Sequence, residues 1–249
     1  MWPKGPFPRL VSQRTRHGPH GRGPTEGNTL VSENQNELTI ENCAVVLIDH
    51  QPAVALMTTP RSQTELISNV TALAKAAKIL DVPTVLTTVG ATGGPLVDPI
   101  FKELSEVFPD VEPIDRVSTN SWSDPRLRAA VEATGRRKLV MAGLSTDVCL
   151  AQAVLGALKS GYEVYFVTDC SAGVSPEAHE DAKTRLSMAG ARPVNWAAVV
   201  SEWTPDYTSP ERVAVTDVLA RHGGTAAHYT DFFVAQVSAG VVKTPDFLK

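Results

Sequence analysis

The chain has 249 residues, of which 43% are hydrophobic and 20% are charged, and its formal net charge is -4 at pH 7. This composition is too apolar for a disordered protein and is sufficient for one full α/β domain. The weak negative charge provides no field that would attract nucleic acid or an anionic membrane, so we expect neither as a partner. The sequence also lacks the run of about eighteen apolar residues that a membrane-spanning helix requires.

The cysteines are few and odd in number, which argues against a disulfide framework in a chain of this length. Cys149 follows a predicted strand, whereas Cys43 and Cys170 lie in apolar surroundings typical of inert core cysteines. We therefore expect reduced thiols and a cytoplasmic protein.

Residues 1–38 are rich in Pro, Gly, Arg and His and show no apolar period, which predicts a flexible or disordered arm. The arginines and the scarcity of acidic residues would suit an organellar targeting peptide. The many Pro and Gly residues would break the amphipathic helix of such a peptide, so a disordered tail or an upstream start codon is the favoured explanation.

From residue 44 onwards, short apolar runs alternate with amphipathic segments that begin at capping residues such as Ser62, Asp98, Asp124 and Ser175. This alternation predicts an α/β fold with an open, mostly parallel six-stranded sheet and helices on both faces, a Rossmann-type three-layer arrangement. We expect strands at 44–49, 83–89, 111–116, 138–143, 163–169 and 192–196, and helices within 62–80, 98–104, 124–135, 148–160 and 175–190.

Two further helices are expected after this repeating unit, at 210–222 and 225–238. The chain is therefore predicted to consist of the arm, a domain over 39–205 and a C-terminal helical extension over 206–249. We expect the extension to pack on the domain or on a neighbouring subunit.

The residues that follow the strands are the candidates for chemistry, because an open parallel sheet binds ligands beyond the carboxyl ends of its strands. Asp49 ends the first predicted strand, Arg116 ends the third, and Cys149 follows the fourth after a tight turn. A carboxylate, a cation and a thiol are thus expected to converge.

Cys149 is predicted to lie in the first turn of a helix, where the helix dipole and unpaired N–H groups lower the pKa of a thiol. The backbone N–H groups of Thr146 and Cys149 would form an oxyanion hole. Asp49 would take the thiol proton and pass it to the leaving group.

The run 143–149 (GLSTDVC), together with Asp49 at the end of the first strand, resembles the isochorismatase-like cysteine hydrolase family over roughly residues 40 to 205. The resemblance implies a six-stranded parallel sheet, a catalytic triad of Asp, Lys and Cys, and a homo-oligomer. It further implies a cis peptide bond between Ser145 and Thr146. Apolar residues 232–234 in the C-terminal extension also favour oligomerisation, because they need covering.

Two departures from the family pattern refine this interpretation. Arg116 stands where the family has lysine; it cannot deprotonate, and it makes forked contacts, as in an uncharacterised branch of the family. The segment 87–94 lacks the Asp-x-His metal site of nicotinamidases, so we expect no metal or other cofactor. Isochorismatases that cleave a vinyl ether do not use a thiol, so Cys149 indicates acyl or carbamoyl chemistry.

Other residues near the predicted site have less specific roles. His50 is expected to be structural or to line the substrate, and Ser145 is a further candidate for lining it. Asn120 and Trp122 follow Arg116 and are candidates to wall an apolar substrate. Asp147 is expected to cap the helix that carries Cys149.

These observations predict a metal-free cysteine hydrolase that acts on a small amide, carbamoyl or related carbonyl substrate through a covalent Cys149 intermediate. The alternatives are a catalytically idle or redox-sensing thiol protein on the same fold, although no C-x-x-C pair is present, and a module that only binds a small ligand.

Overall fold

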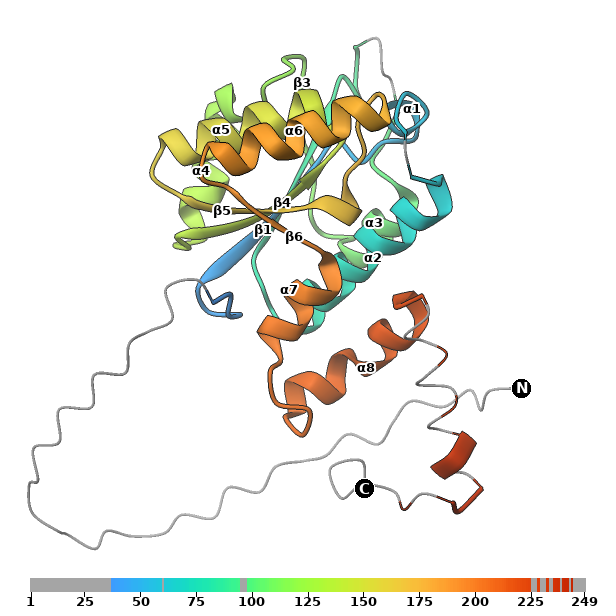
Figure 1. The fold of residues 1–249 in the computed structure, drawn as a ribbon. Helices are drawn as coiled ribbons and strands as arrows, with labels where there is room; N and C mark the ends of the chain where they lie inside the picture. Colours follow the sequence, from blue (N-terminus) through green and yellow to red (C-terminus); the bar gives the residue numbers. More distant parts are fainter. Residues whose placement is uncertain are drawn as a thin grey trace, which may run out of the picture. The chain divides into compact units, whose positions relative to one another are not determined.

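The computed structural model describes residues 37–59, 61–94 and 98–224, together with scattered positions between 228 and 243. Their strands form one six-stranded, all-parallel sheet in the order β3-β2-β1-β4-β5-β6, with helices on both faces, which confirms the predicted fold (Figure 1). The strands are β1 (Cys43–Ile48), β2 (Thr84–Val89), β3 (Ile114–Arg116), β4 (Lys138–Gly143), β5 (Glu163–Val167) and β6 (Arg192–Val194).

The strand order reverses at the centre of the sheet, between β1 and β4. Ile48 pairs there with Gly143, and also with Thr87 of β2 on its other side. A Cβ atom on Gly143 would lie 2.8 Å from the Cβ of Ile48, so only glycine permits this approach. The segments that follow β1 and β4 therefore emerge side by side, at the point where open α/β sheets bind ligands.

The predicted capping residues begin several of the observed helices. Ser62, Asp124 and Ser175 each accept a hydrogen bond from a backbone N–H in the first turn. The helices are α1 (Pro52–Ala55), α2 (Gln63–Ile79), α3 (Lys102–Val107), α4 (Pro125–Ala133), α5 (Ala151–Lys159), α6 (Pro176–Met188), α7 (Trp196–Trp203) and α8 (Pro210–His222).

The core consists of two apolar layers, one on each face of the sheet. Val45 and Leu47 of β1 face the layer under α2, α3 and α7. Val46 and Ile48 face the layer under α4, α5 and α6. Every residue of β1 is buried because both of its faces are covered, which explains its continuous apolar sequence.

Two predicted elements differ in their bounds from the structure, and two observed helices were not predicted. The helix expected at 98–104 instead spans Lys102–Val107, because the Asp98 carboxylate accepts the N–H of Ala53 in α1 at 2.7 Å. The sixth strand ends at Val194, since Asn195 caps α7, a helix absent from the sequence prediction. The short helix α1 was also not predicted.

The ends of the predicted domain also differ in detail. Leu38, assigned above to the arm, is fully buried, and its N–H donates to the Glu202 carboxylate at 2.9 Å. The rest of the arm up to residue 36, and most of the helix expected at 225–238, lie outside the described residues. In α8, Val215 and Val218 are buried in the layer formed with α2. Within the described ranges, no helix is both long and apolar enough to cross a membrane.

The contact between α5 and Trp122 tests this packing. A Cβ atom added to Gly156 would lie 2.6 Å from Cδ1 of the buried indole. We expect Gly156→Ala to lower the free energy of unfolding, because overpacking costs about 1–3 kcal/mol and outweighs a gain in helix propensity of up to about 1 kcal/mol. Urea denaturation measures the change.

The matched control is Gly93→Ala, since nothing lies within 4 Å of the added Cβ there. Its effect should stay within about 0.5 kcal/mol. A Gly156→Ala protein as stable as the wild type would contradict the packing described for Trp122.

Candidate active site

Asp49 is the first residue after β1 and adopts a left-handed backbone conformation, with φ at 56°. Such a conformation is uncommon outside glycine but is tolerated better by Asp than by most residues. Its N–H donates to the carbonyl of Thr87 at 3.0 Å, and its own carbonyl accepts the N–H of Gln51 at 2.8 Å. The chain therefore turns sharply here, and the carboxylate is fully buried at the edge of the sheet.

Arg116, the last residue of β3, forms a two-pronged ion pair with Asp49. Its Nη1 and Nη2 each lie 2.6 Å from a different carboxylate oxygen. Thr87 donates its hydroxyl to Oδ1 at 3.0 Å, and Nη1 also donates to the carbonyl of Thr88 at 2.8 Å. Burial by itself lowers the pKa of Arg116, but the hydrogen bonds and charge of Asp49 outweigh it and raise that pKa. Arg116 is therefore a permanent cation that fixes the carboxylate.

Cys149 lies in a π-helical turn (Thr146–Leu150) that links β4 to α5, and its side chain is largely buried. Burial raises the pKa of its thiol to about 12, and the charge of Asp49 and a hydrogen bond to that carboxylate act in the same direction. Arg116 and the backbone of Ser145 lower the pKa, but by less.

The expectation of a thiol with a lowered pKa was therefore wrong. Cys149 precedes the α-helix instead of lying in its first turn, and it lies next to a buried negative charge. At neutral pH its resting form is a neutral thiol hydrogen-bonded to the Asp49 carboxylate.

The turn that carries Cys149 also corrects two backbone predictions. The cis peptide bond joins Leu144 to Ser145, one residue earlier than expected. The N–H of Thr146 donates to the carbonyl of Ala172 at 2.9 Å, so it is already used and does not suit an oxyanion hole.

Asp147 does not cap the helix, contrary to expectation. Its Oδ1 accepts the N–H of Val174 at 3.1 Å, and the turn begins at Ser145 without a side-chain cap. The carboxylate therefore ties the turn to the segment before α6.

His50 is fully buried and lies in the core beneath the site. Its Nε2 is 2.9 Å from the carbonyl oxygen of Cys170, and its ring meets that of Phe101 edge-on, with 6.0 Å between the centroids. Burial lowers the pKa of His50 to about 4, although the Cys170 carbonyl and the charge of Asp49 oppose this effect. These contacts give His50 a structural role.

The structure gives Asn120 and Trp122 packing contacts. Trp122 is buried against Tyr162, and its Nε1 donates to the hydroxyl of Ser160 at 3.0 Å. Asn120 accepts the N–H of Trp122 at 3.0 Å and so begins a short 3-10 turn. Ser145 is close to the thiol through its backbone.

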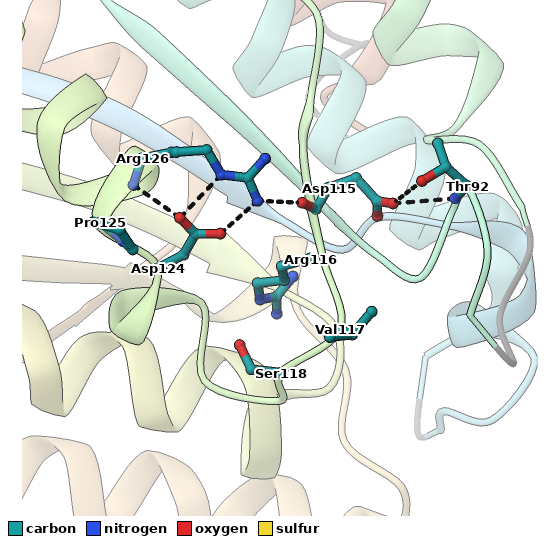
Figure 2. A pocket seen from close by; sticks show the side chains of 8 residues that line it. All are labelled: Thr92, Asp115, Arg116, Val117, Ser118, Asp124, Pro125 and Arg126. Carbon is teal, nitrogen blue, oxygen red and sulfur yellow. Dashed lines mark hydrogen bonds and ion pairs between the residues drawn. The ribbon is translucent and has the colours of Figure 1, made fainter.

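A hollow of about 540 Å³ lies at the end of β3 (Figure 2). Figure 2 shows Arg126 bound to the Asp124 carboxylate and to the carbonyl of Asp115 across this hollow. Cys149 is not among its lining residues, so the hollow itself does not define the reaction site. It is lined by Thr92, Asp115, Arg116, Val117, Ser118, Asp124, Pro125 and Arg126.

Thr87, Thr88 and His179 were not predicted from the sequence. Thr87 and Thr88 hydrogen-bond to the Asp49–Arg116 pair, and His179 contacts the turn that carries Cys149. The two threonines lie on β2, whose strand pattern only indicates burial. His179 is in the first turn of α6, and its spacing from the other site residues carries no motif. No local signal would have identified them.

The fold agrees with the comparison to known families. Residues 43–198 match the isochorismatase domain, so the chain belongs to the isochorismatase family and is a hydrolase of that family. It is 37% identical over 169 residues to the probable hydrolase YcaC of Escherichia coli K12, a match that covers 67% of this chain and 79% of that protein.

Two solved structures share the fold. YcaC from Pseudomonas aeruginosa, solved with hexane-2,5-diol and covalent acrylamide, is 34% identical with a TM-score of 0.75. E. coli YcaC, described as an octameric hydrolase of unknown specificity, is 30% identical with a TM-score of 0.76. Each comparison covers 80% of this chain and 97% of the other.

The buried histidine makes stability depend on pH. Because the pKa of His50 falls from 6.5 to about 4 on folding, the unfolded chain binds the proton first as the pH drops. The contribution of His50 is therefore complete above pH 6.5 and is lost progressively toward pH 4, by roughly 3 kcal/mol in total.

We expect the free energy of unfolding of His50→Gln to fall less between pH 7 and pH 4.5 than that of the wild type, as measured by urea denaturation. His228→Gln, which changes an exposed histidine, is the control and should retain the wild-type pH dependence. Parallel pH profiles for wild type and His50→Gln would contradict a neutral, buried His50.

Proposed function

We propose that this protein is a metal-free cysteine hydrolase in which Cys149 attacks the carbonyl carbon of a small amide, carbamoyl or related substrate. The observation that carries the proposal is the buried Asp49 carboxylate, which Arg116 holds with two hydrogen bonds and which lies close enough to the Cys149 thiol to raise its pKa. Among the described residues, no group of three His, Cys, Asp or Glu side chains is placed to bind a metal ion.

The neutral thiol defines the order of proton transfers. The proton moves from Sγ to the Asp49 carboxylate as the S–C bond forms, so no free thiolate needs to accumulate. Asp49 then protonates the leaving nitrogen as the C–N bond breaks, which leaves a thioester on Cys149. Water attacks the thioester, its proton passes to Asp49, and the carboxylic acid product leaves as the thiol regains its proton. Arg116 keeps its charge throughout and orients the carboxylate.

The oxyanion donor in this proposal is the backbone N–H of Cys149. The N–H of Thr146, the other expected donor, already binds Ala172. A donor in a dry site stabilises the developing negative charge more than water would.

The relatives support the assembly but do not bear on the substrate class. The P. aeruginosa relative carries covalent acrylamide, an electrophile that adds to nucleophiles at its vinyl carbon without breaking an amide bond. We propose a homo-oligomer because the E. coli relative is octameric. We also propose a cytoplasmic location, since Cys43, Cys149 and Cys170 are free thiols.

The redox-sensing alternative receives no support from the site. Oxidation of cysteine proceeds through the thiolate, and the raised pKa of Cys149 disfavours that form.

Alkylation tests the neutral thiol. The negative charge of Asp49 raises the pKa of Cys149, so Asp49→Asn should lower it. We expect iodoacetamide to label wild-type Cys149 slowly below pH 9 and to label the Asp49→Asn protein faster at each pH, as followed by intact mass. Hydrolysis should fall in the same variant, because the proton acceptor is lost.

Asp115→Asn is the matched control, because this carboxylate precedes Arg116 in sequence but accepts hydrogen bonds from Thr88 of β2 and from Ala91 and Thr92 in the loop after β2. Iodoacetamide should label Cys149 in the Asp115→Asn protein at the wild-type rate. Slower labelling of Asp49→Asn would contradict the neutral resting thiol.

The covalent mechanism is tested with a panel of small amides and carbamoyl compounds, by following release of ammonia or amine. Cys149→Ala should lower kcat on the order of 10⁴-fold or more, and a mass increase at Cys149 should appear during wild-type turnover only. Cys170→Ala removes a buried thiol outside the triad and should stay active. Retained turnover in the Cys149→Ala protein would contradict the proposed covalent intermediate.

A further inference from the structure

The turn that carries Cys149 is tied at several points to the segment 171–179. The N–H of Gly143, at the end of β4, donates to the hydroxyl of Ser171 at 3.1 Å. Further along the turn, the N–H of Thr146 and the carboxylate of Asp147 bind the backbone of residues 172 and 174. The position of the nucleophile therefore depends on this second segment as well as on β4.

Among the described residues, His179 makes the one side-chain-to-side-chain hydrogen bond between α6 and this turn. Its Nδ1 lies 2.9 Å from the hydroxyl oxygen of Thr146, and both side chains are buried. The backbone N–H of His179 donates to the carbonyl of Ser175 at 3.0 Å, within the first turn of α6. The imidazole thus extends from a regular helix and hydrogen-bonds to Thr146, which lies three positions before Cys149.

The space around this contact is tightly filled. A Cβ atom on Gly173 would lie 2.9 Å from the backbone nitrogen of His179 and 3.0 Å from Oδ1 of Asp147. Because Gly173 has no side chain, α6 and the turn that carries Cys149 can approach each other closely. This steric observation is independent of the hydrogen bond and indicates the same close fit.

The imidazole is buried with charged groups of both signs nearby. Burial lowers the pKa of His179, so the ring is neutral at pH 7 and forms one hydrogen bond with the Thr146 hydroxyl. The charged groups that face it are Lys183 and Glu180 on α6, Arg61 before α2 and Asp147 on the turn.

We propose that His179 is a positioning residue that, through Thr146, sets the direction of the Cys149 thiol and of the Cys149 N–H toward the substrate carbonyl. The inference rests on the proposed function and deepens it, because it assigns a role to a residue that touches neither substrate nor thiol. A buried hydroxyl–imidazole contact suits this role, since both groups lose a partner if either moves.

The test compares apolar and conservative replacements of the two partners. His179→Leu and Thr146→Val remove the hydrogen bond with little change in size, whereas His179→Asn keeps a polar atom at the δ position and Thr146→Ser keeps the hydroxyl. We expect the apolar variants to lose about tenfold or more in kcat with little change in KM, because small displacements of reacting groups cost that much. The double apolar variant should lose no more than either single variant.

The rate of Cys149 alkylation by iodoacetamide as a function of pH is the second readout. The apolar variants should shift this profile, and the conservative variants should restore both the profile and kcat. His222→Leu is the matched control, because His222 makes a similar 2.9 Å contact with the hydroxyl of Ser68 between α8 and α2. It should affect only stability.

Wild-type kcat and alkylation in His179→Leu would overturn the proposal, as would equal losses in the apolar and conservative variants. If His179→Leu does not fold, the smaller change Thr146→Val decides the question. Failure of the wild type to hydrolyse any amide would contradict the proposed function alone, because the alkylation profiles still report whether His179 positions the thiol.

Discussion

The buried ion pair between Asp49 and Arg116 is the constraint on which the rest of the site depends. The two residues come from the ends of β1 and β3, so the pair spans β2. Thr87 and Thr88 of that strand each add a hydrogen bond to the pair, while Nε of Arg116 is buried without a partner among the described residues. Removal of one partner from such a buried pair costs about 3–5 kcal/mol, because the other charge is left without compensation. The sheet must therefore hold these strand ends in register for the site to exist.

This pair also determines the state of the nucleophile. A carboxylate held by a permanent guanidinium stays where the thiol can donate to it, and its negative charge opposes loss of the thiol proton. In the proposed mechanism, proton transfer and nucleophilic attack are therefore coupled in one step, with Asp49 as the base. An ammonium in place of Arg116 would provide a point charge without the two-pronged geometry.

The sequence predicted that Asp49, Arg116 and Cys149 converge, because strand ends meet at one edge of a parallel sheet, and the structure places the three residues together. Clear apolar runs precede Asp49 and the turn of Cys149, whereas Arg116 ends a short and largely polar segment; the capping residues of α2, α4 and α6 were also clear. The pKa of Cys149 could not be predicted, because it depends on desolvation and on a carboxylate far away in the chain. For the same reason, the use of the Thr146 N–H by Ala172 had no signal in the sequence.

The sequence by itself determined the parallel α/β architecture and the residue types at the active edge, because apolar periodicity and capping are local properties that appear directly in the order of residues. The tertiary structure alone decided that the Cys149 thiol is neutral and that His50 and Trp122 belong to the core. It also decided that His179 of α6 hydrogen-bonds to Thr146 in the turn that carries Cys149. These properties arise from burial and from contacts between segments distant in the chain, and both exist only once the sheet has assembled.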